Sequence, residues 1–198
     1  MEGLELFLRM HAVVHSSRVA AAEGGWSALE ATLDSASEAD LRASPGGANS
    51  VAWALWHTAR IEDVAASVVI APASQVLDQG GFQARMRIPR RDIGVEMSKA
   101  EMRGLSAEVD LGGLLAYRDA VGVRTRAVAA AMPPPRWEQT YGALESARVA
   151  AAGVLSPAGR WLDGFWSGKT MTWFLYWVCT EHSMMHLAYA RMTRRLLG

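Results

Sequence analysis

The sequence predicts an all-α fold, a four-helix bundle with long crossover connections. Apolar residues recur at spacings of three and four along several stretches, which is typical of helices with one buried face. No run of β-branched residues alternates with polar ones between hairpin turns, so strands are not expected. With 198 residues and 51 % hydrophobic side chains, the chain can bury a core of its own, and we expect a single domain over residues 1–198.

Four long helices are expected, joined by two long connections, over residues 4–22, 51–70, 107–132 and 170–197. The apolar face of the first is formed by Leu4, Phe7, His11 and Val14. Gly24 and Gly25 follow it. Before the second, Asn49 and Ser50 offer N-cap oxygens. Ala71-Pro72 ends the second helix.

Shorter helices are expected between these. Residues 27–41 and 137–152 are helix-prone, and Ser98 with Glu101 matches a capping box. Residues 72–97 and 153–168 are interpreted as connections rich in Gly and Pro. The third long helix is predicted in spite of three interior glycines that each cost about 1 kcal/mol relative to Ala, namely Gly112, Gly113 and Gly122.

The last helix has the most regular apolar spacing. Steps of 3, 4, 3, 4, 3 and 4 predict a core seam formed by Leu175, Val178, His182, Met185, Tyr189, Met192 and Leu196. A histidine therefore lies in the middle of a predicted core. In the second helix another histidine follows the same rule, within a seam formed by Ala54, His57, Ile61, Val64 and Val68.

Composition excludes several classes of protein. Twenty basic and 20 acidic side chains give a formal net charge of zero, which argues against nucleic-acid binding, because phosphate neutralisation needs a basic surplus. Cys179 is the single cysteine, so a disulfide, a CxxC pair and a thiolate metal cage are excluded. The N-terminus does not resemble a signal peptide, and no apolar stretch reaches the roughly 20 residues of a membrane span. We expect a cytoplasmic protein without a membrane partner.

Three histidines are candidate metal ligands. His182 and His186 lie one turn apart on the same side of the last helix, and His57 lies in the seam of the second. Buried imidazoles without partners cost about 1–3 kcal/mol each, and a divalent ion would satisfy them while leaving a fourth position open for water or substrate. The alternative is that these are core histidines with ordinary hydrogen bonds. Three imidazoles suit zinc, nickel and iron alike.

Residues near these histidines complete the predicted site. Glu62, Asp63 and Glu181 are candidates to accept the other ring N–H of the ligands, with ordinary surface ion pairs as the alternative. A pocket is expected from the aromatic, apolar and basic side chains around them, namely Trp53, Trp56, Arg60, Met185 and Tyr189. Arg60 could also receive an anionic substrate.

A second pair of histidines has the same spacing. His11 and His15 lie four residues apart in the first predicted helix and could be rival or additional ligands. The preferred interpretation places His11 in the core and His15 in a pocket or at the surface.

The sequence resembles the DinB-like superfamily. Residues 49–63, NSVAWALWHTARIED, are similar to its second-helix motif, and residues 181–187, EHSMMHL, to its last-helix HxxxH. Tyr117 to Ala120 form a Tyr-Arg-Asp-Ala motif in the third helix. The resemblance covers most of the chain in order and length. It implies a DinB/YfiT-like four-helix bundle, commonly a homodimer, whose metal ligands correspond to His57, His182 and His186.

The resemblance also suggests an activity. Relatives of this kind include transferases and isomerases that use a low-molecular-weight thiol, and it implies that the metal acidifies such a thiol for attack on an electrophilic small-molecule substrate. Two other functions stay open from the residues. One is a non-catalytic bundle that binds a hydrophobic small molecule or a partner chain, and the other is a metal-dependent hydrolase.

Overall fold

The protein is described here by a computed structural model of residues 2–197. The prediction of an all-α fold is confirmed, since these residues form helices and no strand, apart from an isolated bridge between Thr140 and Thr170. The α-helices are α1 (Glu2–Val14), α2 (Ala28–Leu33), α3 (Glu38–Arg42), α4 (Val51–Val64), α5 (Val76–Gln79), α6 (Phe82–Met86), α7 (Lys99–Glu108), α8 (Leu111–Ala131), α9 (Pro134–Trp137), α10 (Ala143–Ala152), α11 (Trp161–Trp166), α12 (Met171–Trp173) and α13 (His182–Arg195).

Other helical turns extend these. Short 3₁₀ turns are η1 (Glu23–Gly25) and η2 (Pro45–Gly47). The π-helical segment η3 (Ala65–Ile70) continues α4, and η4 (Phe174–Glu181) joins α12 to α13 without a break. The second and last predicted helices are therefore present as continuous helical segments. None of the helices in residues 2–197 is long and apolar enough to cross a membrane.

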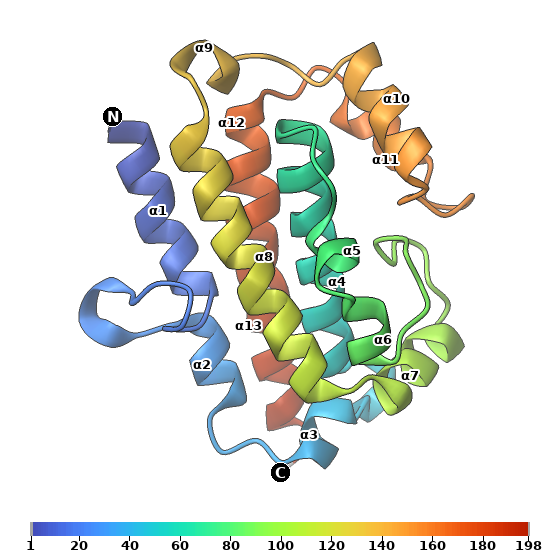
Figure 1. Ribbon diagram of the computed structural model, residues 1–198. Helices are drawn as coiled ribbons and strands as arrows, with labels where there is room; N and C mark the ends of the chain where they lie inside the picture. The colour runs from blue at the N-terminus through green and yellow to red at the C-terminus, as the bar shows by residue number, and fades with distance from the viewer. Residues whose placement is uncertain (1, 198) are drawn as a thin grey trace.

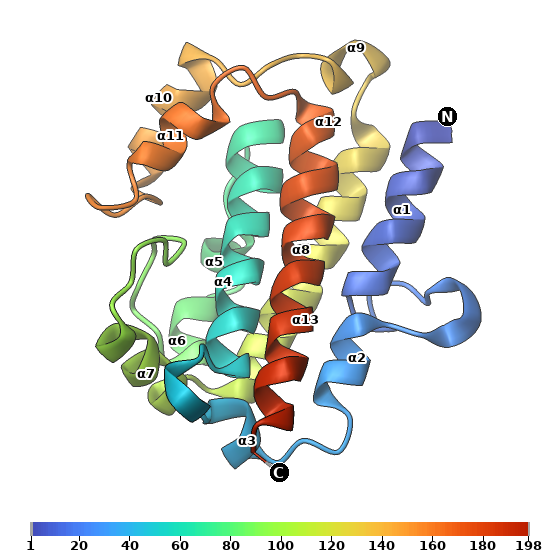
Figure 2. The ribbon, with the colours of Figure 1, turned by 180° about the vertical axis from the view of Figure 1, so that it is seen from behind.

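The long helices lie side by side (Figures 1 and 2). Helix α4 packs against α8 and α13. Helix α1 packs against α8, η4 and α13. The crossover through α5, α6 and α7 returns the chain to the end of the bundle where α4 begins, so α8 runs in the same direction as α4 (Figure 1). Every residue of α4 and η3 is buried, because neighbouring helices cover it on all sides.

Side-chain caps start the helices that carry the site. Ser50 accepts a hydrogen bond from the backbone N–H of Trp53 at 3.0 Å and so caps α4, as predicted. Ser98 and Glu101 form the predicted capping box of α7. Asp110 caps α8 through the N–H of Gly113 at 2.8 Å.

The first helix is shorter than predicted. It ends at Val14 rather than continuing to residue 22. Arg118 donates a hydrogen bond to the Val14 carbonyl at 3.0 Å, and the next residues are held by a Ser16–Asp119 contact of 2.6 Å. Side chains of α8 thus satisfy a carbonyl that a longer helix would have satisfied itself. The polar stretch 27–41 likewise splits into α2 and α3, and the connections contain α5, α6 and α11.

Two of the three interior glycines of α8, Gly113 and Gly122, have packing reasons. A Cβ on Gly113 would lie 2.4 Å from the carbonyl oxygen of Arg85, and one on Gly122 would lie 2.6 Å from Nδ1 of His15. Because only hydrogen fits at these contacts, α8 approaches α6 and the end of α1 closely, which offsets the lost helix propensity.

The predicted seam of the last helix is correct only in its first part. Leu175 and Val178 are buried, whereas Met185, Tyr189, Met192 and Leu196 are 42–68 % exposed. The buried positions of α13 are Ser183, Leu187, Ala190 and Thr193. The π-helical turns of η4 account for the difference, because an i→i+5 turn holds one residue more than an α-turn and so rotates everything after it. His182 and His186 consequently lie at the edge of the core, partly exposed.

Candidate metal centre

Three histidines meet where α4 and α13 pack together. His57, His182 and His186 each offer a ligand atom, and these atoms all lie within 4.8 Å of one another. The ring centroids are separated by 5.0 Å for His57 and His182, 4.9 Å for His57 and His186, and 4.5 Å for the two histidines of α13. The structure therefore brings together the three histidines that the sequence singled out.

His57 is held in one orientation. Its Nδ1 donates a hydrogen bond to the backbone carbonyl of Ile93 at 2.5 Å, and its ring stacks on Trp53 with centroids 4.9 Å apart and planes 6° apart. Since Nδ1 carries the proton, Nε2 keeps its lone pair. A backbone carbonyl in this position is a common partner of a metal-bound histidine.

The loop that supplies this carbonyl is fixed by close packing. Gly94 has φ +76°, and a Cβ there would lie 2.5 Å from the Trp56 ring. The N–H of Ile93 donates to the Val154 carbonyl at 3.0 Å, and that of Gly94 to Asp92 at 2.8 Å. Ile93 and Gly94 were not predicted from the sequence, because both lie in the crossover 72–97. The glycine at residue 94 is the signal that could have pointed to them.

Burial keeps all three imidazoles neutral. It lowers the pKa of His57 to about 4, against a weaker opposing effect of the Ile93 hydrogen bond. Burial, followed by the neighbouring His57, lowers the pKa of His186 to about 3 and that of His182 well below its ordinary value. Neutral imidazole is the form that binds a metal ion, so the cluster is in its ligand form at neutral pH.

The residues fit a divalent ion. Nδ1 of His182 is buried and has no hydrogen-bond partner within residues 2–197, so protein contacts leave this ring unsatisfied. Three neutral nitrogen donors with an open side match the ligand set of catalytic zinc sites. The same donors also suit nickel and iron.

A cavity of about 320 Å³ borders the cluster at His186. Its lining is mostly apolar, with Lys99 as the charged side chain; it consists of Ala48, Asn49, Ala54, Lys99, Met185, His186, Tyr189, Ala190 and Thr193. Nζ of Lys99 donates to Oδ1 of Asn49 at 2.8 Å. The cavity has room for a small molecule with one anionic group.

Two of the predicted pocket residues line the cavity, and the two tryptophans lie in the core behind the cluster. Met185 and Tyr189 line this cavity. Trp53 is buried against His57 and also meets His186 edge-on, at 5.7 Å between centroids. Trp56 is fully buried behind them, where it supports Gly94. Both tryptophans therefore support the cluster from the core side.

Arg60 lies outside the cavity. Its guanidinium is fully buried and donates to Tyr117 at 2.8 Å and to Gln75 at 2.9 Å, as well as to the carbonyl of Arg91. With these donors engaged, Arg60 fastens the crossover to α4, and the expected contact with an anionic substrate has no support in this geometry.

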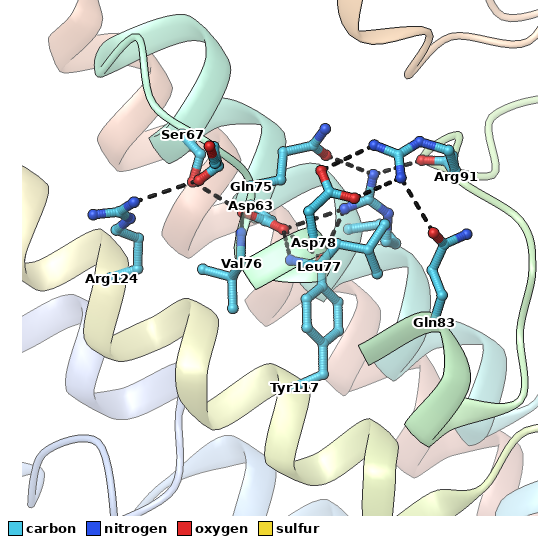
Figure 3. Close-up of polar contacts among 12 residues, drawn as sticks. Asp63, Ser67, Gln75, Val76, Leu77, Asp78, Gln83, Arg91, Tyr117 and Arg124 are labelled. Carbon is cyan, nitrogen blue, oxygen red and sulfur yellow. Dashed lines mark hydrogen bonds and ion pairs between the residues drawn. The ribbon is translucent and has the colours of Figure 1, made fainter. Parts of the chain in front are cut away.

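Asp63 belongs to the same buried network (Figure 3). Its carboxylate accepts hydrogen bonds from Tyr117 at 2.8 Å and from the backbone N–H groups of Val76 and Leu77 at 3.0 Å. It therefore caps α5 and does not contact the three histidines. The Tyr117 of the Tyr-Arg-Asp-Ala motif is a structural contact between α8 and α4.

Two further acids also lie away from the cluster. Glu181 is exposed and lines a shallow groove beside α1. Glu62 is fully buried and hydrogen bonds to the other histidine pair, His11 and His15. Within residues 2–197, the ring N–H of His57 donates to the Ile93 carbonyl, and no carboxylate accepts a hydrogen bond from the three-histidine cluster. Helical rotation is the reason, because Glu62 and Asp63 face other sides of α4 than His57 does.

His11 and His15 are both fully buried. His11 is in the core, as preferred, whereas His15 is neither in a pocket nor at the surface. His15 follows the last residue of α1, and its ring stacks on His11 with centroids 4.2 Å apart.

Comparison with known proteins identifies the relationship. Residues 21–190 match the family model of the DinB superfamily. No curated protein matched the sequence.

Proposed function

This chain belongs to the DinB superfamily, and from that premise we propose that it is a metal-dependent enzyme whose ligands are His57, His182 and His186. The proposed ion is zinc, with nickel or iron as alternatives. The observation that carries the proposal is the convergence of three neutral imidazoles within 4.8 Å beside a cavity.

The proposed reaction transfers a low-molecular-weight thiol to an electrophile. A divalent ion, when bound, lowers the pKa of a thiol or water ligand by several units. Ile93 and Trp53 hold His57 in the tautomer and orientation that a ligand needs. His182 and His186 supply the ligands from α13, and His186 also lines the cavity.

The cavity supports a small, partly apolar substrate. Met185, Tyr189 and Ala190 provide apolar walls that limit water around the reacting groups. Lys99, which also belongs to the lining, can pair with a carboxylate of the thiol or of the electrophile. A substrate bound between Lys99 and His186 would present its reactive atom to the metal side.

The first test measures metal content. We expect untagged wild-type protein to retain a metal ion at the three-histidine cluster after dialysis, and His182→Ala to lose that ion while its far-UV circular dichroism stays helical. Ser183→Ala is the matched control, because the Ser183 hydroxyl is buried without a partner in the described residues and its loss removes no ligand. An unchanged metal content in His182→Ala would refute the assignment.

The second part of the test measures activity. Zinc-replete protein is incubated with a panel of low-molecular-weight thiols and electrophiles, with His182→Ala as the metal-free comparison. Thiol-dependent product formation that requires His182 supports the proposal. Product formed without any thiol would instead indicate water as the nucleophile, and retained metal with no turnover would favour a binding module.

We also propose that the protein is a homodimer, as the family resemblance implies. One chain has a mass of 21.4 kDa. Light scattering should give about twice this value, and the mass of a single chain would contradict the proposal.

A further inference from the structure

A second cluster of potential ligands lies in the core, away from the cavity. His11 of α1, His15 just after it and Glu62 of α4 place one ligand atom each within 4.8 Å of the others. Nε2 of His11 lies 2.9 Å from Oε1 of Glu62, and Nε2 of His15 lies 3.2 Å and 3.0 Å from its two oxygens. Each imidazole thus contacts the Glu62 carboxylate through its Nε2 atom.

These distances suit a shared metal ion. Ligands at about 2.0–2.2 Å from a tetrahedral ion lie roughly 3.3–3.5 Å from each other. The observed contacts of 2.9–3.2 Å would need to widen by only about a few tenths of an ångström. The cluster offers two ring nitrogens and one carboxylate, whose two oxygens both lie within hydrogen-bond distance of His15.

Glu62 is paired with two histidines and, in the described residues, with no arginine or lysine. All three side chains are fully buried, and the side chains that hydrogen bond to Glu62 in the described residues are the two imidazoles. The buried guanidinium of Arg118 donates to Thr58 and to the Val14 carbonyl instead. In residues 2–197 no arginine or lysine hydrogen bonds to Glu62, although a buried carboxylate without a cation is costly.

The surrounding backbone is shaped around the imidazoles. His15 packs directly against Gly122 of α8, where a Cβ would lie 2.6 Å from its Nδ1. Nδ1 of His11 and Nδ1 of His15 have no hydrogen-bond partner in the described residues. Each ring is therefore oriented through its Nε2, toward the point that it shares with Glu62.

We propose that His11, His15 and Glu62 bind a second divalent metal ion of the zinc type, at a closed site that fastens the end of α1 to α4. Two imidazoles and a carboxylate are a common ligand set for zinc and for iron. The ion supplies a positive charge beside Glu62, which no arginine or lysine contacts in the described residues, and the absence of exposed surface on all three residues gives the site a structural role. This site is independent of the three-histidine cluster and of its reaction.

The experiment counts metal ions after refolding. Because the three side chains are inaccessible in the folded chain, the protein is unfolded with chelator, refolded with excess zinc and dialysed. Wild-type protein should then hold two zinc ions per chain, and the variant His182→Ala/His186→Ala should hold one. Chelator should remove one ion from folded wild type quickly and the other only on unfolding.

A conservative variant assigns the second ion. Introduced into the His182→Ala/His186→Ala background, His11→Gln keeps an N–H donor for Glu62 but removes a metal ligand, so the stoichiometry should fall from one to zero. The assignment does not depend on this variant folding, because the background variant has an intact His11–His15–Glu62 cluster. If that background variant refolds and holds no zinc, the cluster is a hydrogen-bonded one and the proposal is overturned.

Discussion

At the scale of single residues, the metal centre depends on a glycine that touches no ligand. Gly94 adopts φ +76° and lies against the Trp56 ring, and this conformation aims the preceding carbonyl, that of Ile93, at His57. A side chain at residue 94 would strain the backbone and push the loop off the ring. The orientation of His57 is therefore decided by backbone geometry 36 residues away in the chain.

Gly94→Ala is expected to destabilise the protein by about 1–3 kcal/mol, because a non-glycine residue at positive φ and a contact with Trp56 both cost energy. Weakened support of His57 should also lower metal affinity about 10–100-fold. Urea unfolding and metal titration measure the two effects.

The matched control is Gly104→Ala in α7, where a Cβ would meet nothing within 4 Å. It should stabilise the protein by about 0.5–1 kcal/mol through helix propensity. An unchanged metal affinity in Gly94→Ala would show that this loop does not fix His57.

At the scale of elements, the π-helical segment η4 decides which face of α13 is buried. The extra residue per turn moves Leu187 to the core, where it is 1 % exposed, and moves Met192 out to 61 % exposure. It also leaves His182 and His186 at the border between core and cavity. A regular α-helix would have turned these two histidines to a different side. A π-helical turn next to a functional site is a recurrent feature of proteins.

Leu187→Ala should therefore cost about 2–5 kcal/mol of unfolding free energy, since it opens a hole in the core. Met192→Ala should stay within about 0.5 kcal/mol of wild type, because its side chain is exposed. Urea unfolding of the two variants decides between the two registers of the last helix. The seam predicted from the sequence, without a π-helical turn, would give the larger loss of unfolding free energy for Met192→Ala.

At the scale of the whole molecule, metal binding should be linked to stability. An ion that binds only the folded chain at 100 times its dissociation constant adds about 2.7 kcal/mol, and each kcal/mol raises the Tm of a domain of this size by about 2–4 °C. The three-histidine site alone should thus raise Tm by roughly 5–11 °C under these conditions.

Differential scanning calorimetry with and without chelator measures this rise. His182→Ala should lose the part of the Tm rise that is due to the three-histidine site, and Ser183→Ala should keep it. If the Tm of the wild-type protein is the same with and without chelator, metal binding at that cluster is contradicted.

The sequence by itself determined the helical class, the cap at Ser50 and the candidate ligands His57, His182 and His186, because apolar spacing, N-cap chemistry and imidazoles one turn apart are local properties of the chain. The seam expected in the second helix is not distinguished by burial, since every residue of α4 and η3 is buried.

Only the tertiary structure decided the surroundings of these ligands. The end of α1 at Val14 depends on Arg118 of α8, the acceptor for His57 is a carbonyl of the crossover, and Arg60 and Asp63 are engaged with Tyr117. Each of these contacts joins residues that are far apart in the chain and whose meeting depends on helix rotation and loop path. Local spacing carries no information about helix rotation or loop path. The residues that contact the histidines could therefore not be predicted, although the histidines themselves could.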